Sequence, residues 1–139
     1  MADLTRFTAA HQRDFSAALR EITNGRKESH WMWYIFPQMK GLGYSPTAQY
    51  YGVESLEEAR AFLADPYLGG NLTAICQALL RLSSDNATEI FGRPDDMKLR
   101  SSMTLFSLAA GGDSVFDRVL DRFFGGRPDP RTLELLGME

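Results

Sequence analysis

The chain has 139 residues, of which 44% are hydrophobic and 24% are charged, and its formal net charge is −3. This length and composition predict one folded domain spanning residues 1–139, and they argue against a disordered chain. Acidic and basic residues are interspersed without a basic stripe, which argues against nucleic acid as a partner.

The chain contains no apolar run close to the roughly 20 residues of a membrane-spanning helix, so we expect no membrane partner. The first residues, Met1-Ala2-Asp3-Leu4, lack the basic and then apolar layout of a signal peptide. We therefore expect a soluble, cytoplasmic protein. The pattern gives no prediction of the oligomeric state.

The first predicted element is an amphipathic helix that ends at Asn24-Gly25, a typical C-terminal stop. Ser29 is predicted to cap a short helix from His30 to Phe36, because Pro37 disfavours helical geometry at the residue before it. A strand is the alternative for this segment, since aromatic and β-branched residues favour strands. The apolar face of the first helix carries Phe7, His11, Phe15, Leu19 and Ile22.

Residues 37–54 contain Gly41, Gly43 and Pro46 and are predicted to form a loop. After this loop, Ser55 and Glu58 have the spacing of a capping box at the start of a helix. The expected fold is all-α, a compact irregular bundle of five to six main helices with short connecting turns. The later helices are expected at Ser55–Ala64, Gly70–Leu82, Thr88–Phe91, from Asp95 or Asp96 to Ala110, at Ser114–Phe124, and from Asp129-Pro130 onward.

Residue types suited to metal binding are scarce, because the chain has two histidines and one cysteine at separated positions. A zinc site needs three or four such ligands at one point, so we predict no metal and no cofactor. Gly41-Leu42-Gly43 is not followed by a Gly-Lys-Ser/Thr ending, so the chain has neither a Walker loop nor a dinucleotide fingerprint. These glycines are expected to permit a tight turn, and the alternative is that they let backbone N–H groups approach an anion. Cys76 lies in an apolar helical context and is expected to be buried and inert.

The segment from Lys27 to Gln38 is the strongest candidate for a functional site, since it holds both tryptophans and one of the two histidines. His30 is expected near a helix N-terminus, where the helix dipole lowers the pKa of an imidazole and leaves it neutral for ligand binding. The alternative is that His30 donates to a backbone carbonyl and orders the turn. Trp31 and Trp33 are two residues apart, so one of them is expected to leave the core and to be available for stacking on a planar ligand.

Ser101-Ser102, in the middle of a predicted helix, is the second candidate. Serine is a mediocre helix former, and Lys98 shares a helix face with Ser102, so a lysine–serine pair that activates a hydroxyl is conceivable. The alternative is that the serines allow close helix packing and that Lys98 is solvated. His11 is interpreted as a hydrogen-bonded core residue.

These motifs resemble a known family, the domain of unknown function 1810 (DUF1810). The resemblance is carried by the block Lys27-x-Ser29-His30-Trp31-Met32-Trp33-Tyr34-Ile35-Phe36-Pro37-Gln38 and continues through Gly41-Leu42-Gly43-x-Ser45 to Asp96-x-Lys98-Leu99-x-Ser101-Ser102-Met103-Thr104-Leu105-Phe106. The resemblance implies a small helical bacterial domain and implies no reaction. The family often has glutamine at the position of His11, which argues against an obligatory acid–base role there. Some members are labelled calpastatin, which does not fit, because calpastatin segments are disordered and this composition predicts a packed domain.

Three functions are compatible with the sequence. The favoured one is a pocket that binds a small polar ligand, anionic or planar. The second is an enzyme acting on a nucleotide-like metabolite with His30 as acid–base group, which contact with another titratable group across a cleft would favour. The third is a protein-interaction module with an exposed aromatic face, which a flat patch would favour over a concavity. The expected pocket lining is Lys27, His30, Trp33, Gln38, Lys98, Ser101 and Ser102.

One pocket can serve both candidate motifs only if His30 and Ser102 converge on the same cavity. Both motifs depart from local sequence preferences, and such departures tend to occur at functional sites. We therefore expect His30 and Ser102 to lie within contact range.

Overall fold

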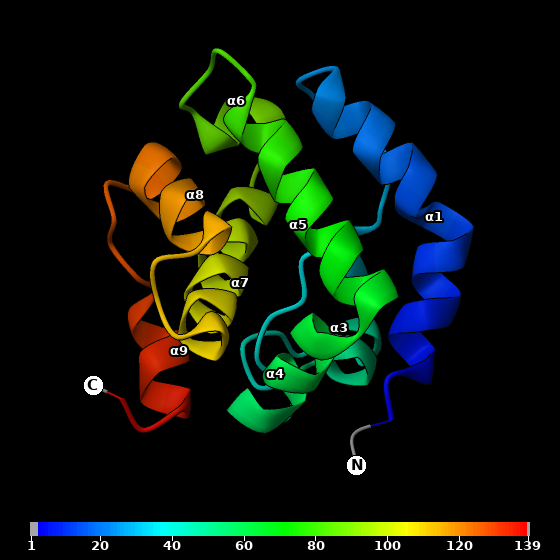
Figure 1. Cartoon of the computed structure of the whole chain (residues 1–139), viewed down its shortest axis with the longest axis vertical. Helices are drawn as coiled ribbons and strands as arrows, with labels where there is room; N and C mark the ends of the chain where they lie inside the picture. Colours follow the sequence, from blue (N-terminus) through cyan, green and yellow to red (C-terminus); the bar gives the residue numbers. More distant parts are fainter. Residues whose placement is uncertain (1–2, 139) are drawn as a thin grey trace.

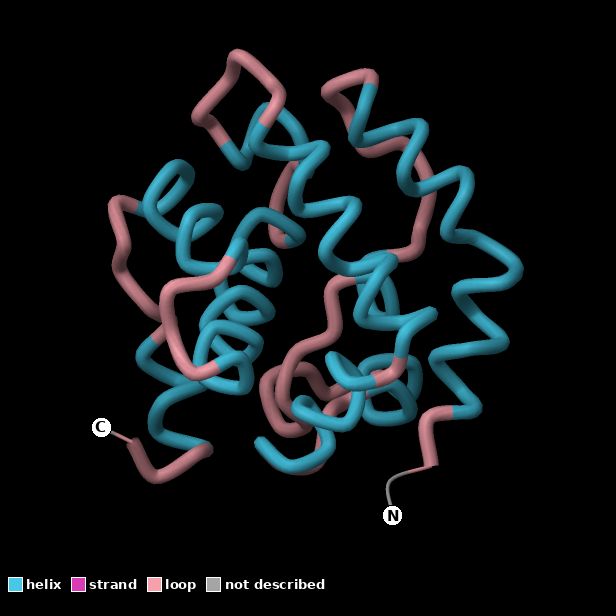
Figure 2. Tube along the Cα trace, in the orientation of Figure 1, coloured by secondary structure: helices cyan, strands magenta, loops and turns pink. Residues whose placement is uncertain are grey.

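The structure, a computed structural model, describes residues 3–138. Over these residues the chain forms helices joined by loops and no strand (Figures 1 and 2), so the all-α prediction is confirmed. Five helices are nine residues or longer: α1 (Thr5–Thr23), α4 (Leu56–Ala64), α5 (Pro66–Leu80), α7 (Asp95–Ala110) and α8 (Val115–Phe124). The shorter ones are α2 (Met32–Ile35), α3 (Pro46–Tyr51), α6 (Ala87–Phe91) and α9 (Pro130–Leu135).

The long helix α5 lies between α1 on one side and α8 on the other, and α7 packs against both α4 and α8 (Figure 1). Aromatic rings run through the centre of this arrangement. The ring of Phe62 on α4 lies 5.2 Å from the ring of Phe7 on α1 and 5.3 Å from that of Phe106 on α7. The buried apolar side chains form one continuous cluster that joins these helices.

Polar caps explain where most helices begin. The Ser55 hydroxyl accepts from the Glu58 N–H at 3.1 Å, as predicted. The predicted capping box is nevertheless incomplete, because the Glu58 carboxylate accepts from the N–H of Glu54 and pairs with Arg6 instead of reaching Ser55. Asp129 accepts from the Thr132 N–H, and Pro130 occupies the first turn, which confirms the predicted start of α9.

Outside the segment Lys27–Gln38, three predictions about helix starts are wrong. α5 begins at Pro66 and not at Gly70, because Asp65 accepts from two early backbone N–H groups and proline suits a first helical turn. The predicted loop 37–54 contains α3, which Ser45 caps in the same way. The predicted cap of α7 at Asp95 or Asp96 is misplaced: Pro94 is the N-cap residue and both aspartates lie inside the first turn, where the Asp96 carboxylate accepts from the Met97 N–H at 2.8 Å.

The short helix predicted at His30–Phe36 is reduced to α2, Met32–Ile35. Ser29 does not cap it, since the Ser29 hydroxyl donates to the carboxylate of Glu21 on α1 at 2.7 Å. Trp31 precedes the helix with φ −133°, outside the helical region. The Glu21 carboxylate on α1 therefore binds the Ser29 hydroxyl, which the sequence predicts as the cap of this helix.

None of the helices within residues 3–138 combines the length and the apolar character needed to cross a membrane. Cys76 is fully buried on α5 beside the sulfur of Met103, and burial raises the pKa of its thiol. The prediction of a buried cysteine is confirmed.

Candidate functional site

Glu21 holds the tryptophan-containing block in place. It lies in the last turn of α1, is 5% exposed, and accepts from the N–H groups of Glu28 and Ser29 at 2.7 and 2.8 Å. Its carboxylate also accepts from the Ser29 hydroxyl at 2.7 Å and from Nε1–H of Trp31 at 2.9 Å. Burial alone would raise the pKa of Glu21, but these donors outweigh it and lower the pKa to about 2. The segment before α2 is therefore folded around an ionised carboxylate.

The block itself packs into the core, as predicted for its apolar residues. Trp31, Ile35 and Phe36 are all essentially buried. The rings of Trp31 and Phe36 both contact Phe91 on α6, with centroids 6.5 and 5.7 Å away. Trp33 is only half-buried, which agrees with the prediction that one of the two tryptophans leaves the core.

Two of the chain's three lysines meet at a single carboxylate beside Trp33. Lys27 Nζ lies 2.9 Å from Oδ2 of Asp95, and Lys98 Nζ lies 3.4 Å from Oδ1. Each ammonium also lies over an indole ring, Lys27 at 5.0 Å from the Trp31 centroid and Lys98 at 5.3 Å from the Trp33 centroid. The side chains of Lys27 and Lys98 are 7% and 26% exposed. We call Lys27, Lys98, Asp95 and Trp33 the lysine cluster, and its formal charge is +1.

Lys27 also borders a hollow of about 340 Å³ at the junction of α6 and the segment after α1. Ile90 and Phe91 are apolar residues that line this hollow, and Arg26 and Glu89 are charged residues that line it. The Lys27 N–H donates to the Ile90 carbonyl at 2.7 Å, which ties the block to α6. The hollow gives the lysine cluster a concave neighbour on the side of α6.

His30 is exposed, and within residues 3–138 its ring makes no hydrogen bond or ion pair. The Tyr34 hydroxyl, which donates its one proton to Asp14, lies 3.2 Å from the carbonyl oxygen of His30. In the structure the His30 ring therefore does not donate to a backbone carbonyl, which was the alternative role for this residue. In the chain it lies between Ser29 and Trp31, three positions from both Lys27 and Trp33.

The other predicted lining residues have separate surroundings. The side-chain amide of Gln38 lies near Gly43, where an added Cβ would be 3.7 Å from Nε2. The Ser101 hydroxyl lies 3.2 Å from Oδ2 of Asp129, which fixes it to the start of α9. Ser102 is fully buried, and its hydroxyl has no hydrogen-bond partner in the described part of the chain. The structure thus brings Lys27, Trp33 and Lys98 together, and the convergence of His30 with Ser102 stays a prediction.

Replacing each serine by alanine separates their roles. Ser102→Ala removes a buried hydroxyl without a partner and is expected to raise the free energy of unfolding by about 1 kcal/mol. Ser101→Ala removes the bond to Asp129 and is expected to lower it by about 1 kcal/mol. Urea denaturation of both variants measures the difference. Equal losses in the two would show that the Ser102 hydroxyl has a partner in solution.

His11 is a satisfied core residue. Its Nε2 lies 2.8 Å from the Tyr34 carbonyl, which can only accept, so Nε2 carries the proton. Nδ1 then accepts from the side-chain amide of Asn71 at 3.1 Å. Burial lowers the pKa of His11, which keeps the imidazole neutral. The interpretation of His11 as a hydrogen-bonded core residue is confirmed.

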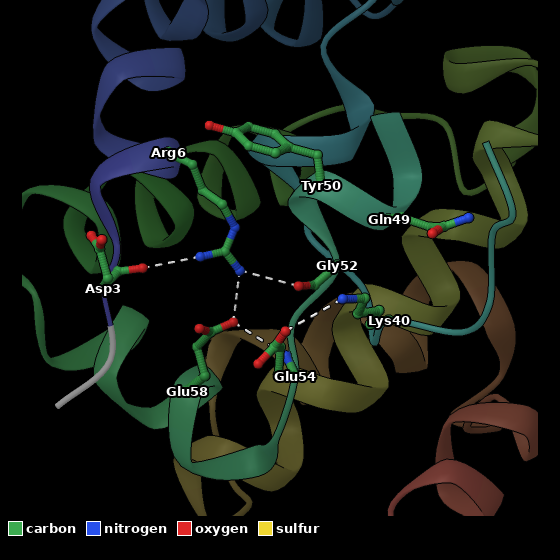
Figure 3. A pocket seen from close by; sticks show the side chains of 8 residues that line it. All are labelled: Asp3, Arg6, Lys40, Gln49, Tyr50, Gly52, Glu54 and Glu58. Carbon is green, nitrogen blue, oxygen red and sulfur yellow. Dashed lines mark hydrogen bonds and ion pairs between the residues drawn. The ribbon is translucent and has the colours of Figure 1, made fainter. Parts of the chain in front are cut away.

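A second hollow, of about 500 Å³, surrounds Arg6 and was not predicted (Figure 3). The Arg6 guanidinium pairs with Glu58 at 2.8 Å and donates to the carbonyls of Asp3 and Gly52 at 3.0 and 3.1 Å. Figure 3 shows Gln49 pointing away from Arg6. Because Arg6 already has three partners here, this hollow offers less unsatisfied charge than the lysine cluster.

Metal ligation has no candidate within residues 3–138, where no three side chains of the ligating types come together. The residues that sequence reasoning missed are Glu21 and Asp95. Local cap rules assign Asp95 only as a possible helix cap, although its spacing of three from Lys98 is typical of an ion pair on one helix face.

Comparison with known proteins places the chain among proteins without an assigned activity. The sequence profile described as "Protein of unknown function (DUF1810)" matches residues 1–136. A solved structure, the conserved hypothetical protein Rv1873 from Mycobacterium tuberculosis, is 43% identical. The match covers 99% of this chain and 98% of that one, with a TM-score of 0.94. A search of curated proteins gives no match.

Proposed function

We propose, from the premise that the chain belongs to the DUF1810 family of proteins of unknown function, that it binds a small anion carrying a planar ring at the lysine cluster. The observation that carries this function is the sharing of one carboxylate, Asp95, by Lys27 and Lys98. One positive charge is left over, and both ammonium groups are partly removed from water. An anion that reaches them replaces the missing counter-charge.

Lys98 is the group best placed to receive the anion. Lys27 is held by Asp95 and by the Ser29 carbonyl at 2.6 Å, and it is almost fully covered. Lys98 has one ion pair, at the longer distance of 3.4 Å, and a larger exposed fraction. An ammonium has three N–H donors, so Lys98 retains donors for a ligand.

Trp33 supports a planar ring on the same ligand. The Lys98 ammonium lies over the Trp33 ring, and the indole is half-buried, so one part of it is open to contact. A ring that stacks on the open part of the indole brings an attached phosphate or carboxylate toward Lys98. His30, which is exposed and lies three positions before Trp33 in the chain, is proposed to add a donor or acceptor for the ligand.

The proposal includes no reaction. An acid–base role would need His30 to face a second titratable group, and the His30 ring makes no hydrogen bond or ion pair within residues 3–138. The interaction-module hypothesis has one point in its favour, since Tyr44 and Tyr50 are strongly exposed. Those tyrosines lie outside the lysine cluster and do not bear on its ligand.

Isotope labelling of the lysines and the tryptophans tests the proposal, because the chain has only three lysines and two tryptophans. Adenosine monophosphate serves as the probe, with inorganic phosphate and adenosine as its two halves. We expect the monophosphate to shift the side-chain NMR signals of Lys98 and Lys27 and the indole signal of Trp33, while Lys40 stays unchanged. Each half alone should bind about tenfold more weakly or worse.

Two variants and one control complete this test. Lys98→Gln removes the receiving ammonium and should lower the affinity about tenfold, as expected for one charge-assisted contact. Trp33→Leu should weaken the monophosphate but not inorganic phosphate. Arg60→Gln, which removes one exposed positive charge on α4, is the control. If Lys40 shifts as much as Lys98, or if Lys98→Gln binds as well as the wild type, the lysine cluster is not the site.

A further inference from the structure

A second surface, where α7 meets the end of α8, combines apolar walls with arginines that pair with no carboxylate within residues 3–138. The hollow there measures about 350 Å³ and lies between α7 and the end of α8. Its lining is Met97, Arg100, Phe123, Phe124 and Arg127. We infer that this hollow binds an apolar carboxylate, a single carboxylate group attached to an aromatic or branched aliphatic body.

Arg100 is held ready for an anion. Its Nε donates to the Arg127 carbonyl at 2.9 Å and its Nη2 donates to the Pro128 carbonyl at 2.8 Å. These two bonds fix the guanidinium without neutralising it, because carbonyls carry no net charge. Within residues 3–138, Nη1 of Arg100 makes no hydrogen bond and neither Arg100 nor Arg127 pairs with a carboxylate. A fixed guanidinium loses little conformational entropy when it binds a carboxylate.

Arg127 stands on the same hollow and is also held by a carbonyl. Its Nε donates to the Phe124 carbonyl at 3.4 Å. Two guanidinium groups on one small hollow favour a carboxylate over any neutral or cationic group, since each can donate charge-assisted hydrogen bonds.

The apolar walls select the rest of the ligand. Phe123 and Phe124 are half-buried, and Met97 is 47% exposed although it is a large hydrophobic residue. A volume of about 350 Å³ is at the lower end for ligand pockets and suits a body no larger than one aromatic ring with a short chain.

A neighbouring hollow of about 550 Å³ argues against polyanions. It shares Met97, Phe123, Phe124 and Arg127 with the first hollow. Its lining also includes one further arginine, Arg122, and three aspartates, Asp85, Asp96 and Asp121. Across both hollows three arginines face three aspartates, so their formal charges cancel. A nucleic acid or polyphosphate gains no net attraction here, whereas one carboxylate can sit at Arg100, the arginine that borders only the hollow free of aspartates.

The test uses methionine methyl groups as reporters. N-acetyl-phenylalanine is the probe. N-acetyl-phenylalanine amide, which lacks the carboxylate, and acetate, which lacks the ring, are the controls. We expect a saturable shift of the Met97 methyl signal with N-acetyl-phenylalanine, and none at buried Met103. The amide and acetate should each bind about tenfold more weakly or worse. No saturable shift at tens of millimolar, or an amide that binds as well as the acid, overturns the inference.

Arginine variants locate the carboxylate. Arg100→Gln and Arg127→Gln should each weaken N-acetyl-phenylalanine about tenfold, and Arg118→Gln, on an exposed part of α8, should not. Two separate variants are used because Arg100 also supports the backbone at Arg127 and Pro128. Undiminished binding in both would refute the assignment.

One further titration distinguishes the possible natural sources of the carboxylate. It measures the affinity of a tetrapeptide that ends in phenylalanine with a free C-terminus. Binding about tenfold tighter than N-acetyl-phenylalanine identifies the C-terminus of a partner polypeptide as the source. Equal or weaker binding identifies a free small acid. Both outcomes uphold the apolar carboxylate as the ligand chemistry.

Discussion

Replacing Glu21 by alanine is expected to destabilise the protein by about 3 kcal/mol. Four donors lose their acceptor at once, two backbone N–H groups, the Ser29 hydroxyl and Nε1–H of Trp31. Glu28 and Ser29 are exposed overall, so water can reach some of these groups and limit the loss. The Trp31 donor is buried and has no such replacement.

The same residue makes stability depend on pH in a definite direction. The pKa of Glu21 falls from its usual 4.5 to about 2 on folding, so the folded state binds its proton less readily than the unfolded state. Its contribution is complete above pH 4.5 and is lost as the pH falls toward 2. A difference of this size corresponds to about 3.5 kcal/mol at 1.4 kcal/mol per pH unit.

Urea denaturation at several pH values between 7 and 2 measures both effects. Glu21→Gln keeps the shape of the side chain without its charge, so the gap in unfolding free energy between wild type and this variant should shrink as the pH falls. Glu134→Ala, which removes an exposed carboxylate on α9, is the control and should stay within about 0.5 kcal/mol of the wild type. A gap that stays constant down to pH 2 would mean that Glu21 is not ionised against these donors.

Local signals in the sequence were enough for most of the helices. Glycine stops, the serine cap at Ser55 and the Asp129-Pro130 start act within a few residues, so they can be read without knowing the fold. The missed start at Pro66 and the missed helix α3 had the same kind of signal, a polar cap followed by proline, at Asp65-Pro66 and Ser45-Pro46. In both places proline occupies the first turn of a helix and does not break one.

The site was harder to predict because its key contacts join segments far apart in the chain. Asp95 pairs with Lys98 three residues away, but its stronger contact is with Lys27, 68 positions earlier by residue number. No local pattern specifies that contact. Glu21 did leave a signal, since a carboxylate in the last turn of a helix is disfavoured by the helix dipole and so points to a partner elsewhere. The block after α1 is that partner.

Ser29 shows how tertiary contacts override a local preference. Alone, a serine before a short aromatic run is a good cap. In the folded protein its hydroxyl and its N–H both bind the Glu21 carboxylate. A buried carboxylate needs several donors to stay ionised, and meeting that need moves the start of α2 to Met32.

Replacing Trp31 by alanine is expected to cost about 3–5 kcal/mol, while Trp33→Ala costs about 1–2 kcal/mol. Both changes truncate a tryptophan to alanine, at positions two residues apart. Trp31 is 1% exposed, packs against Phe36 and Phe91, and donates to Glu21, whereas Trp33 is half-buried. The difference in unfolding free energy between the two variants therefore reflects how deeply each tryptophan is buried, because the residue type removed is the same.

Chemical denaturation of both variants, together with Ile35→Ala and Phe36→Ala, decides whether the block is a structural core with one tryptophan on its surface. Ile35 and Phe36 are as well buried as Trp31, and their loss should cost about 2–5 and 3–5 kcal/mol. Equal costs for Trp31→Ala and Trp33→Ala would mean that Trp33 is as much a core residue as Trp31. Stacking of a ligand on Trp33 would then have no open surface to use, and the proposed ligand would lose its platform. A small cost at Trp33 leaves the side chain available, because a surface indole that contributes little to stability is free to contribute to binding.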